Sequence, residues 1–401
     1  MVDVDRKDKS SAVALPEQRR ERSIRMSKSI IFCADGTWNS PGDLVNGKMV
    51  GEPTNVFKLY FDLEGTPSQE NINLKEEQEK STASGTQVAK YIHGVGDSAN
   101  PLVKLMGGAV GAGTVIRILR GYTYISRKYK PGDKIFIVGF SRGAYTVRAL
   151  TGLIASCGLL DARSHDLENK DLAYRLAASI WYGYRKKNAK KDAGLLSKLQ
   201  SVVMDFPYFF QSPIAEPHLI SDISIDTVAV WDTVGALGVP VLDIATGYPV
   251  DVFKFANTAL SPQVANGIHF ISVDEQRTFY TPTLWHARQG VEQVLYPGAH
   301  ADVGGGYSEC DLSDCSLNDM QALLAARGLC FANPPHLTLN PNPLGLAHTP
   351  WLDPGITSAL RAPRLELKNI KKSACLIARL QGGLVSAGTS NFTAIYAPTN
   401  I

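Results

Sequence analysis

Short runs of hydrophobic residues recur along this chain at intervals that suit buried β-strands. Five of these runs cover residues 29–33, 134–138, 224–230, 268–273 and 291–295. Between the runs, hydrophobic residues follow helical spacing over residues 115–128, 144–154, 172–187 and 316–327. Alternation of buried strands with amphipathic helices is typical of α/β proteins. The pattern therefore predicts an α/β fold with a mainly parallel sheet and helices on both of its faces.

Polar residues follow the carboxyl ends of the predicted strands. These residues are Asp35, Ser141, Asp232, Asp274 and His300. In open α/β sheets, ligands bind outside the carboxyl ends of the strands. The spacing of the five residues therefore predicts a functional site at this edge of the sheet.

The remaining segments divide the chain into regions. Residues 1–28 are polar and charged, which predicts a disordered tail, and residues 29–330 hold the main domain. Residues 160–217 are predicted to be a helical insertion. One interpretation is a solvent-exposed helical segment held by a cluster of buried aromatic residues. The other is a cap, or lid, whose basic and aromatic groups contact an anionic lipid surface. Residues 331–401, rich in proline and asparagine at their start, predict an irregular appendage packed on the main domain.

The motif Gly-x-Ser-x-Gly at residues 139–143 lies between a predicted strand and a predicted helix. Gly139 and Gly143 have no Cβ, so the chain can make a sharp turn that lifts the Ser141 hydroxyl clear of the backbone. The helix that follows directs free N–H groups and its positive dipole end at the place where an oxyanion would form. In this context the motif predicts that Ser141 is a nucleophile.

A serine hydroxyl needs a base to remove its proton, and the base needs an acid to orient it. His300 is the best candidate base, because it follows a strand, lies in a glycine-rich loop and comes after both candidate acids in the chain. His286 is the alternative base. His269 lies inside a hydrophobic strand and is expected to be a core residue, whereas His93 precedes Ser141 and breaks the expected chain order.

Two aspartates are candidates for the acid. Asp232 ends the strand that follows the nucleophile strand, and Asp274 ends the next one. Either position can serve in an α/β hydrolase, so spacing alone does not choose between them. Asp302, two residues after His300, is expected to fix the loop or to support the triad from behind rather than to belong to it.

An oxyanion hole needs two backbone donors. The N–H of Arg142 is the first by position, because it directly follows the nucleophile. The second is expected from a loop after an early strand, where Gly36 allows close backbone approach and Asp35 has a supporting role. The Gly-Val-Gly segment at residues 94–96 is an alternative source of this donor.

Net charge, cysteine spacing and hydrophobic stretches limit the classes of function that fit this chain. The 401 residues carry a formal net charge of +3, which gives no case for nucleic-acid binding. Six cysteines stand without zinc-binding spacing, so we expect reduced thiols, and the predicted chemistry requires no metal or organic cofactor. No hydrophobic region follows the charged start, and no uncharged stretch reaches the ~18 residues of a membrane span. We therefore expect a cytoplasmic protein, or one exported without a classical signal peptide.

Several of these motifs together resemble a known family. The matching segments are residues 31–39, 94–96, 131–133, 139–150, 230–238, 274–277 and 296–307. They extend over most of the chain and are similar to the uncharacterised α/β-hydrolase domain shared with bacterial type VI secretion lipase effectors of the first class, which are phospholipases. The resemblance implies an α/β-hydrolase fold.

The resemblance also implies a triad of Ser141, Asp232 and His300, so it favours Asp232 over Asp274. It implies a serine ester hydrolase of the lipase or phospholipase type that acts on a lipid or small ester. The partners it implies are a membrane surface, contacted peripherally, and a secretion-system or immunity protein. Two alternatives remain, an esterase or thioesterase for small acyl substrates and a non-catalytic hydrolase fold that serves as a binding module.

Overall fold

The computed structural model describes most of the chain. The described residues are 27–36, 43–45, 48–68, 77–94, 109–189, 217–234, 241–242, 249–250, 259–354, 360–364, 367–382, 384–387, 392–398 and 400–401. The predicted tail at residues 1–28 therefore lies almost wholly outside them.

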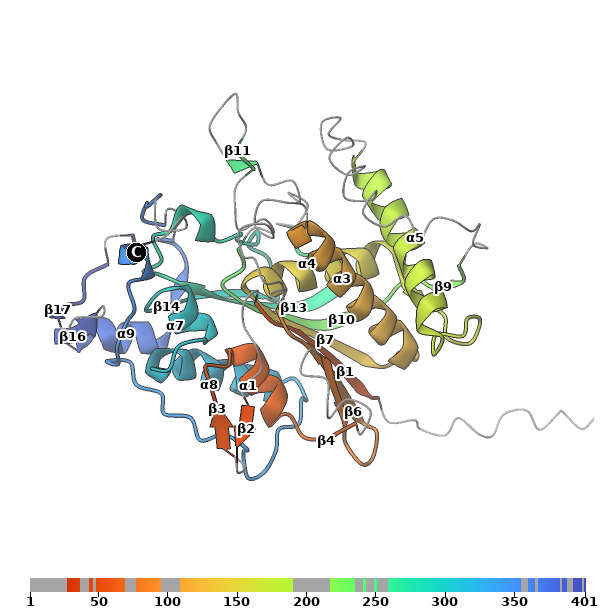
Figure 1. Ribbon diagram of the computed structural model, residues 1–401, viewed down its shortest axis with the longest axis horizontal. Coiled ribbons are helices and arrows are strands. Elements are labelled where there is room, and N and C mark those ends of the chain that lie inside the picture. Colours follow the sequence, from red (N-terminus) through yellow and green to blue (C-terminus); the bar gives the residue numbers. More distant parts are fainter. Residues whose placement is uncertain are drawn as a thin grey trace, which may run out of the picture.

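Nine described strands form one central sheet (Figure 1). Their order is β15-β14-β13-β10-β7-β1-β6-β5-β4. Neighbouring strands are parallel from β15 to β6, and the pairs β6–β5 and β5–β4 are antiparallel. The bounds are β1 (Ser29–Ala34), β4 (Thr66–Pro67), β5 (Glu77–Ser81), β6 (Gln87–Ile92), β7 (Lys134–Phe140), β10 (Ile225–Trp231), β13 (Val264–Ser272), β14 (Val291–Tyr296) and β15 (Lys371–Lys372). The predicted α/β fold with a mainly parallel sheet is confirmed.

Helices cover both faces of the sheet because its strands are hydrophobic on both faces. In β1, Ile30, Phe32 and Ala34 point into one hydrophobic cluster, and Ile31 and Cys33 point into the other. The first cluster is completed by α3 (Ala109–Lys128), α4 (Ser141–Cys157) and α5 (Lys170–Ala189). The second is completed by α1 (Asn55–Asp62), α7 (His300–Gly304) and α8 (Asp311–Ala325). Figure 1 shows these two groups of helices on opposite sides of the sheet.

The predicted strands and helices are all present, with ends that differ by a few residues. The pattern did not predict α1, β6 or β5, and the sequence of β5, Glu-Gln-Glu-Lys-Ser, contains no hydrophobic residue. Such a strand is possible near the edge of a sheet, where its hydrogen bonds rather than a buried face hold it in place. The predicted insertion at 160–217 contains α5, and its aromatic cluster at 206–210 lies outside the described residues.

The region predicted to be irregular, residues 331–401, contains regular structure as well. Its helix α9 (Ala374–Gln381) begins at Ser373, whose Oγ accepts a hydrogen bond from the N–H of Leu376. Such a cap satisfies one of the free N–H groups of a helix start.

Among the helices that the structure describes, none combines the length and the hydrophobicity of a membrane-spanning segment.

The smaller elements are short pairs of strands and two turns of 3-10 helix. The pairs are β2 (Asp43–Val45) with β3 (Lys48–Val50), β8 (Leu159–Leu160) with β9 (Leu219–Ile220), β11 (Val241–Leu242) with β12 (Pro249–Val250), and β16 (Leu384–Ala387) with β17 (Phe392–Ile395). The 3-10 turns are η3 (Thr278–Tyr280) and η4 (Pro350–Leu352).

Gly121 in α3 and Gly183 in α5 differ in how closely other residues pack against them. A Cβ at Gly121 in α3 would lie 2.7 Å from side-chain atoms of Leu150 and Phe32, whereas a Cβ at Gly183 in α5 would meet nothing within 4 Å. We expect Gly121→Ala to lower the free energy of unfolding by about 1–3 kcal/mol through overpacking. Gly183→Ala should raise it by up to about 1 kcal/mol, because alanine favours helix. Thermal unfolding of both variants measures this, and a Gly121→Ala protein as stable as the wild type would contradict the packing.

Candidate active site

Ser141 lies at the junction of β7 and α4 in a strained backbone conformation. Its φ is 56°, in the left-handed region that non-glycine residues rarely adopt. A Cβ at Gly139 would lie 2.7 Å from the backbone of Gly143, and a Cβ at Gly143 would overlap the carbonyl oxygen of Ala34. Both glycines are therefore required for the turn. This is the strand, sharp turn and helix that the Gly-x-Ser-x-Gly motif predicted.

The first turn of α4 begins at the strained serine. The first four N–H groups of a helix have no acceptor within the helix, and the N–H of Arg142 is one of them. These groups and the positive end of the helix dipole favour negative charge at this place. The arrangement can therefore stabilise an anion that forms next to Ser141.

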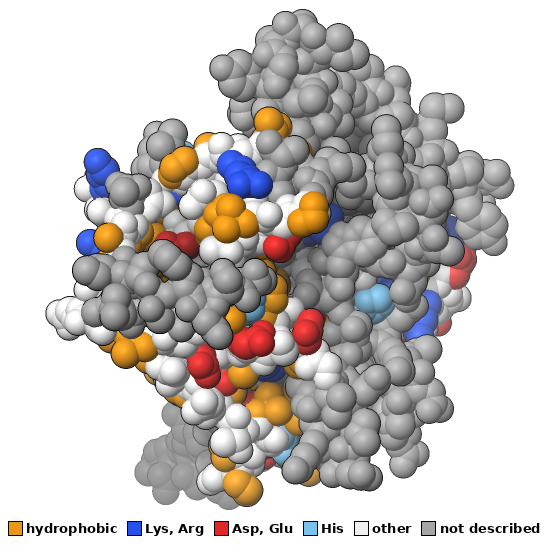
Figure 2. Space-filling model, turned by 60° about the vertical axis from the view of Figure 1, so that its left-hand side comes forward, with side chains coloured by type: hydrophobic (Ala, Val, Ile, Leu, Met, Phe, Trp, Pro, Cys, Tyr) orange, Lys and Arg blue, Asp and Glu red, His pale blue; other side chains and the backbone are white. Residues whose placement is uncertain are grey.

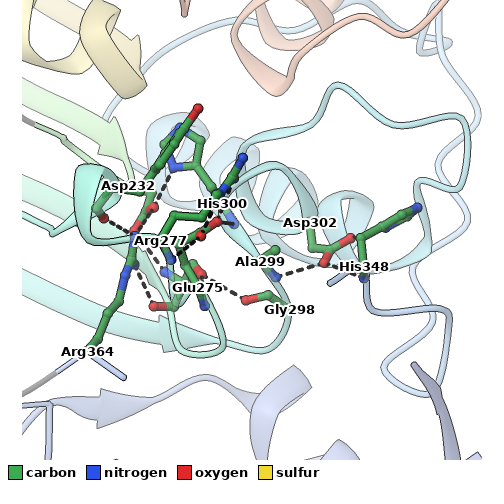
Figure 3. Close-up of polar contacts among 11 residues, drawn as sticks. Asp232, Glu275, Arg277, Gly298, Ala299, His300, Asp302, His348 and Arg364 are labelled. Atoms are coloured by element: carbon green, nitrogen blue, oxygen red, sulfur yellow. Dashed lines mark hydrogen bonds and ion pairs between the residues drawn. The ribbon is translucent and has the colours of Figure 1, made fainter. Parts of the chain in front are cut away.

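Asp232 and His300 are brought together from positions 68 residues apart in the chain. Asp232 follows β10, His300 begins α7 after β14, and the two side chains are joined by a 2.6 Å hydrogen bond from Nδ1 to Oδ2 (Figure 3). Asp232 is fully buried and His300 is 5% exposed. Among the described residues, the buried Nε2 of His300 has no hydrogen-bond partner. An imidazole oriented by a carboxylate at one nitrogen and free at the other can accept a proton.

Two aromatic rings hold the imidazole of His300 in place. The ring centroid of Phe140 lies 4.5 Å from that of His300, and the ring of Tyr280 meets His300 edge-on at 4.8 Å. A Cβ at Gly304 in α7 would overlap the ring of Phe140, so the histidine helix packs closely on this ring. Phe140 directly precedes Ser141, so the contact places the imidazole beside the turn that carries the serine.

A salt bridge holds Asp232 from the other side. Arg364 donates from Nη1 to Oδ1 at 2.6 Å and from Nη2 to Oδ2 at 2.8 Å, and Oδ1 also accepts a hydrogen bond from the N–H of Ser272 at 3.0 Å. Burial alone would raise the pKa of Asp232, but the charge of Arg364 and the hydrogen bonds of Arg364 and His300 outweigh burial and hold this pKa well below its usual range. Asp232 therefore stays ionised throughout the pH range in which enzymes work.

Three carboxylates fix the loop that leads to His300. The consecutive N–H groups of residues 298, 299 and 300 donate in turn to Asp274 at 2.6 Å, Asp302 at 2.8 Å and Glu275 at 3.2 Å. A hydrogen bond from a backbone N–H to a carboxylate is among the stronger kinds. The histidine therefore starts α7 from a backbone whose direction is set at three successive residues; Figure 3 shows the bond of Ala299 to Asp302.

Asp274, the alternative acid, does not contact His300. Its Oδ2 accepts hydrogen bonds from the N–H of Gly298 and from the hydroxyl of Tyr396 at 2.7 Å. Burial raises the pKa of Asp274 to about 6. The structure thus places Asp232, and not Asp274, against the candidate base.

Asp302 bonds to the loop before His300 and to a residue far along the chain. Besides the N–H of Ala299, it accepts hydrogen bonds from the N–H and the Nδ1 of His348, at 2.9 and 2.7 Å. The ring of Tyr307 stacks on that of His348 at 3.7 Å. This cluster ties residues beyond 331 to the histidine helix.

Asp35 supports the end of β1, and its contacts change the assignment of the oxyanion hole. Its Oδ1 accepts from the N–H of Gly36 and the hydroxyl of Thr54, both at 2.7 Å, and its Oδ2 accepts from the hydroxyl of Tyr91 at 2.6 Å. Burial raises the pKa of Asp35 to about 6. The N–H of Gly36, expected as the second oxyanion donor, is engaged with Asp35 in this structure. A role in the oxyanion hole would require this local bond, of the kind that aspartate forms with nearby backbone, to be released.

The other histidines lie apart from the Asp232–His300 pair. His269 is fully buried in β13, where its Nε2 accepts a hydrogen bond from the N–H of Thr233 at 3.1 Å, as expected for a core residue. His286 is exposed. Of the alternative donor segment 94–96, only Gly94 is among the described residues.

Sequence reasoning missed the charged residues around Asp232 and His300. Glu275 is fully buried and accepts two hydrogen bonds from the guanidinium of Arg277 at 2.8 Å, and Arg277 stacks on the ring of Tyr280. The signal for Glu275 was its place directly after a strand end, beside Asp274. Arg364 lies in a segment without periodicity, so no local pattern could have revealed it.

All six cysteines are free thiols, as their spacing predicted. Within the described residues, no group of three or more His, Cys, Asp and Glu side chains is arranged to hold a metal ion.

Comparison with known proteins identifies the family. Residues 28–322 match the family model described as the catalytic domain of Tle1-like phospholipase effectors of the type VI secretion system. An uncharacterised protein of Saccharomyces cerevisiae is 25% identical over 277 residues, which are 64% of this chain and 33% of that protein. This chain thus spans only about a third of the yeast protein.

Two solved structures are also similar. An uncharacterised protein from Pseudomonas aeruginosa has a TM-score of 0.40 and 17% identity, over 76% of this chain and 46% of that chain. The Tle1 effector bound to the VgrG spike of the type 6 secretion system has a TM-score of 0.37 and 15% identity, over 71% of this chain and 52% of that chain. The present chain spans about half the length of each.

The two candidate acids can be separated by substitution. We expect Asp232→Asn to lower kcat for ester hydrolysis by about 10⁴-fold, because an amide cannot hold the imidazole in the required tautomer or stabilise its charged form. Asp274→Asn should retain most of the activity, because the amide oxygen can still accept from Gly298 and no contact to His300 is lost. Steady-state kinetics on a chromogenic ester measure both. A greater loss in Asp274→Asn than in Asp232→Asn would reverse the assignment.

The environment of His300 predicts the pH dependence of the reaction. Burial lowers the pKa of His300 below its ordinary value near 6.5, against the opposing hydrogen bond and charge of Asp232. The rate falls as the pH drops through this pKa, because a protonated imidazole cannot accept the serine proton. The acid limb of kcat/KM should therefore have its midpoint below pH 6.5. A midpoint above pH 7 in a pH–rate profile would contradict the buried, neutral imidazole.

Proposed function

Because the chain belongs to the family of Tle1-like phospholipase effector catalytic domains of the type VI secretion system, we propose that it is a serine carboxylic ester hydrolase of the α/β-hydrolase type. In this proposal Ser141 is the nucleophile, His300 the general base and acid, and Asp232 the residue that orients the imidazole. The family assignment supports the reaction class, and the geometry of the site supports the roles of the three residues.

The reaction follows from the geometry in two half-reactions. Nε2 of His300 removes the proton of Ser141 as its oxygen attacks the ester carbonyl, and the imidazolium then protonates the leaving alcohol. Water, activated by the same imidazole, hydrolyses the acyl-enzyme. The N–H of Arg142 donates to the oxyanion of each tetrahedral intermediate, and a second donor comes from the loop after β1. No step requires a metal or an organic cofactor.

One observation supports these roles above all others. The carboxylate of Asp232 fixes His300 through Nδ1, while the opposite nitrogen is buried and unpartnered beside the turn of Ser141. With Nδ1 bonded to Asp232, Nε2 is the nitrogen left to accept a proton. A reacting serine would supply the missing partner.

A phospholipid is the substrate class that the family favours, and contact with a membrane surface would deliver it. The C-terminal region exposes large hydrophobic side chains, including Leu352 at 62%, Leu360 at 50% and Ile377 at 43%. On the face shown in Figure 2, hydrophobic side chains are interspersed with charged ones rather than gathered in one continuous patch. This distribution suits reversible, peripheral contact with a lipid surface better than deep insertion.

Partners follow from the same family. One solved member is bound to a VgrG spike, so we propose that this protein also meets a secretion-system component. An immunity protein that blocks the site would be a second partner. Nucleic acid is not among the expected partners.

The proposal is tested with purified wild-type protein and two serine variants. Ser141→Ala should lose about 10⁴-fold or more of the activity on p-nitrophenyl esters and phospholipid vesicles, together with labelling by a fluorophosphonate probe. Ser308→Ala, at an exposed serine, is the matched control and should retain both. Activity in the Ser141→Ala protein equal to that of the wild type would refute the nucleophile.

The same experiment separates the alternatives. Activity that rises with acyl chain length and extends to vesicles supports a phospholipase or lipase. Activity confined to short esters supports a small-acyl esterase or thioesterase. A folded wild-type protein with neither turnover nor probe labelling would favour a non-catalytic binding module.

A further inference from the structure

Arg364 joins three separate parts of the candidate active site. Its two Nη atoms form a bidentate salt bridge with Asp232, and they also donate to the carbonyl oxygens of Ser272 and Tyr280. The arginine is 5% exposed and Asp232 is fully buried, so water does not screen the pair. Figure 3 shows Arg364 on the side of Asp232 away from His300.

Backbone hydrogen bonds hold the segment that contains Arg364 in this position. The N–H of Ala362 donates to the carbonyl of Gln276 at 2.8 Å, and the N–H of Thr278 donates to the carbonyl of Leu360 at 3.1 Å. These bonds form an antiparallel bridge between Arg277 and Arg361. Residues 360–364 therefore lie along the loop that follows β13, and the loop in turn carries the ring of Tyr280 against His300.

Arg364 lies outside the part of the chain that matches the catalytic-domain family. The match ends at residue 322, and Arg364 belongs to the following segment. A residue from beyond the matched domain thus makes the closest charged contact to the candidate triad acid. The C-terminal segment is consequently part of the site rather than an accessory to it.

We propose that Arg364 is a positioning residue, which fixes the carboxylate of Asp232 and shares its negative charge, so that His300 is both oriented and kept neutral. The proposal rests on the function proposed above for Asp232 and His300.

The orientation follows from the contacts of the two carboxylate oxygens. Oδ1 accepts from Arg364 and from the N–H of Ser272, and Oδ2 accepts from Arg364 and from His300. A carboxylate held at both oxygens by a planar guanidinium cannot rotate without breaking two charge-assisted bonds. Oδ2 is therefore kept in line with Nδ1 of His300.

The charge sharing follows from the groups that surround His300. Asp232 and Glu275 are its acidic neighbours, Arg277 is paired with Glu275, and the rings of Phe140 and Tyr280 pack on the imidazole. Glu275 is thus neutralised by its own arginine. Without Arg364, the full charge of Asp232 would act on His300 and favour the imidazolium, which cannot serve as a base.

Three variants test the proposal: Arg364→Met, Arg364→Lys and, as a matched control, Arg361→Met. Arg361 is an exposed arginine of the same segment, and its backbone makes the same bridge. The measurements are thermal unfolding, kcat and KM against pH, and the titration of His300 followed by NMR of ¹⁵N-labelled histidine, which needs no substrate.

We expect Arg364→Met to lower kcat by about 100-fold, the loss typical of a catalytic group displaced by ~1 Å, with a smaller change in KM. The pKa of His300 should also rise, because the full charge of Asp232 would then favour the imidazolium. Arg364→Lys retains the charge without the planar pair of donors, and it should reverse part of both changes. Arg361→Met should resemble the wild type in every measurement.

Support for the proposal requires both changes in a folded protein. A kcat within about twofold of the wild type, or a pKa of His300 that does not rise, would overturn it. So would a loss of activity that merely follows the fraction unfolded, because Arg364 would then be structural only. If Arg364→Met does not fold, Arg364→Lys is judged by the same two criteria. If the wild-type protein hydrolyses no ester, the proposed function fails, and the titration alone decides whether Arg364 controls His300.

Discussion

A single buried charge, the carboxylate of Asp232, is the constraint on which the candidate site depends. An isolated carboxylate inside a protein costs several kcal/mol unless charges and hydrogen bonds compensate for it. Here the compensation comes from the guanidinium of Arg364, the backbone of β13 and the imidazole of His300. Each of these groups comes from a different part of the chain, so the site forms only when the sheet, the histidine loop and the C-terminal segment have assembled.

The histidine loop uses the same physical device on a smaller scale. Three successive N–H groups at residues 298–300 each meet a different carboxylate. Asp274 and Glu275 lie in the segment that follows β13, and Asp302 lies within α7, so the loop is held from two sides. The position of His300 is therefore set by backbone hydrogen bonds as much as by the contact of its side chain with Asp232.

The sequence was informative where structure depends on neighbours in the chain. Buried parallel strands are continuous hydrophobic runs, and the strained turn of Ser141 requires Gly139 and Gly143, so both could be recognised from local pattern. Strand order left Asp232 and Asp274 open as partners of His300, and the family resemblance favoured Asp232. The polar strand β5 gave no hydrophobic signal, since hydrogen bonds near the sheet edge hold it rather than a buried face.

The contacts that the sequence did not reveal join residues that are distant in the chain or that compete locally. Arg364 is 132 residues from Asp232 and lies in a segment without periodicity, so only the folded chain reveals its role. The donor role of Gly36 was inferred from its freedom of approach, and the carboxylate of its neighbour Asp35 takes up the same N–H. Neither hydrogen-bond competition nor long-range pairing leaves a periodic signal in a sequence.

The bond between Asp35 and Thr54 has a consequence for how proteins of this architecture can diversify. Thr54 caps α1 through Phe57, bonds to Asp35 at the end of β1 and bridges to Gly305 after the histidine helix. Asp35 and Thr54 are therefore held together at one point. Because loop closure costs little more as a loop lengthens, residues could be inserted or removed between Gly36 and Thr54 without shifting the strand end or α7. Evolution could thus vary the length and sequence of the chain between Gly36 and Thr54 while the geometry of Asp232 and His300 stayed unchanged.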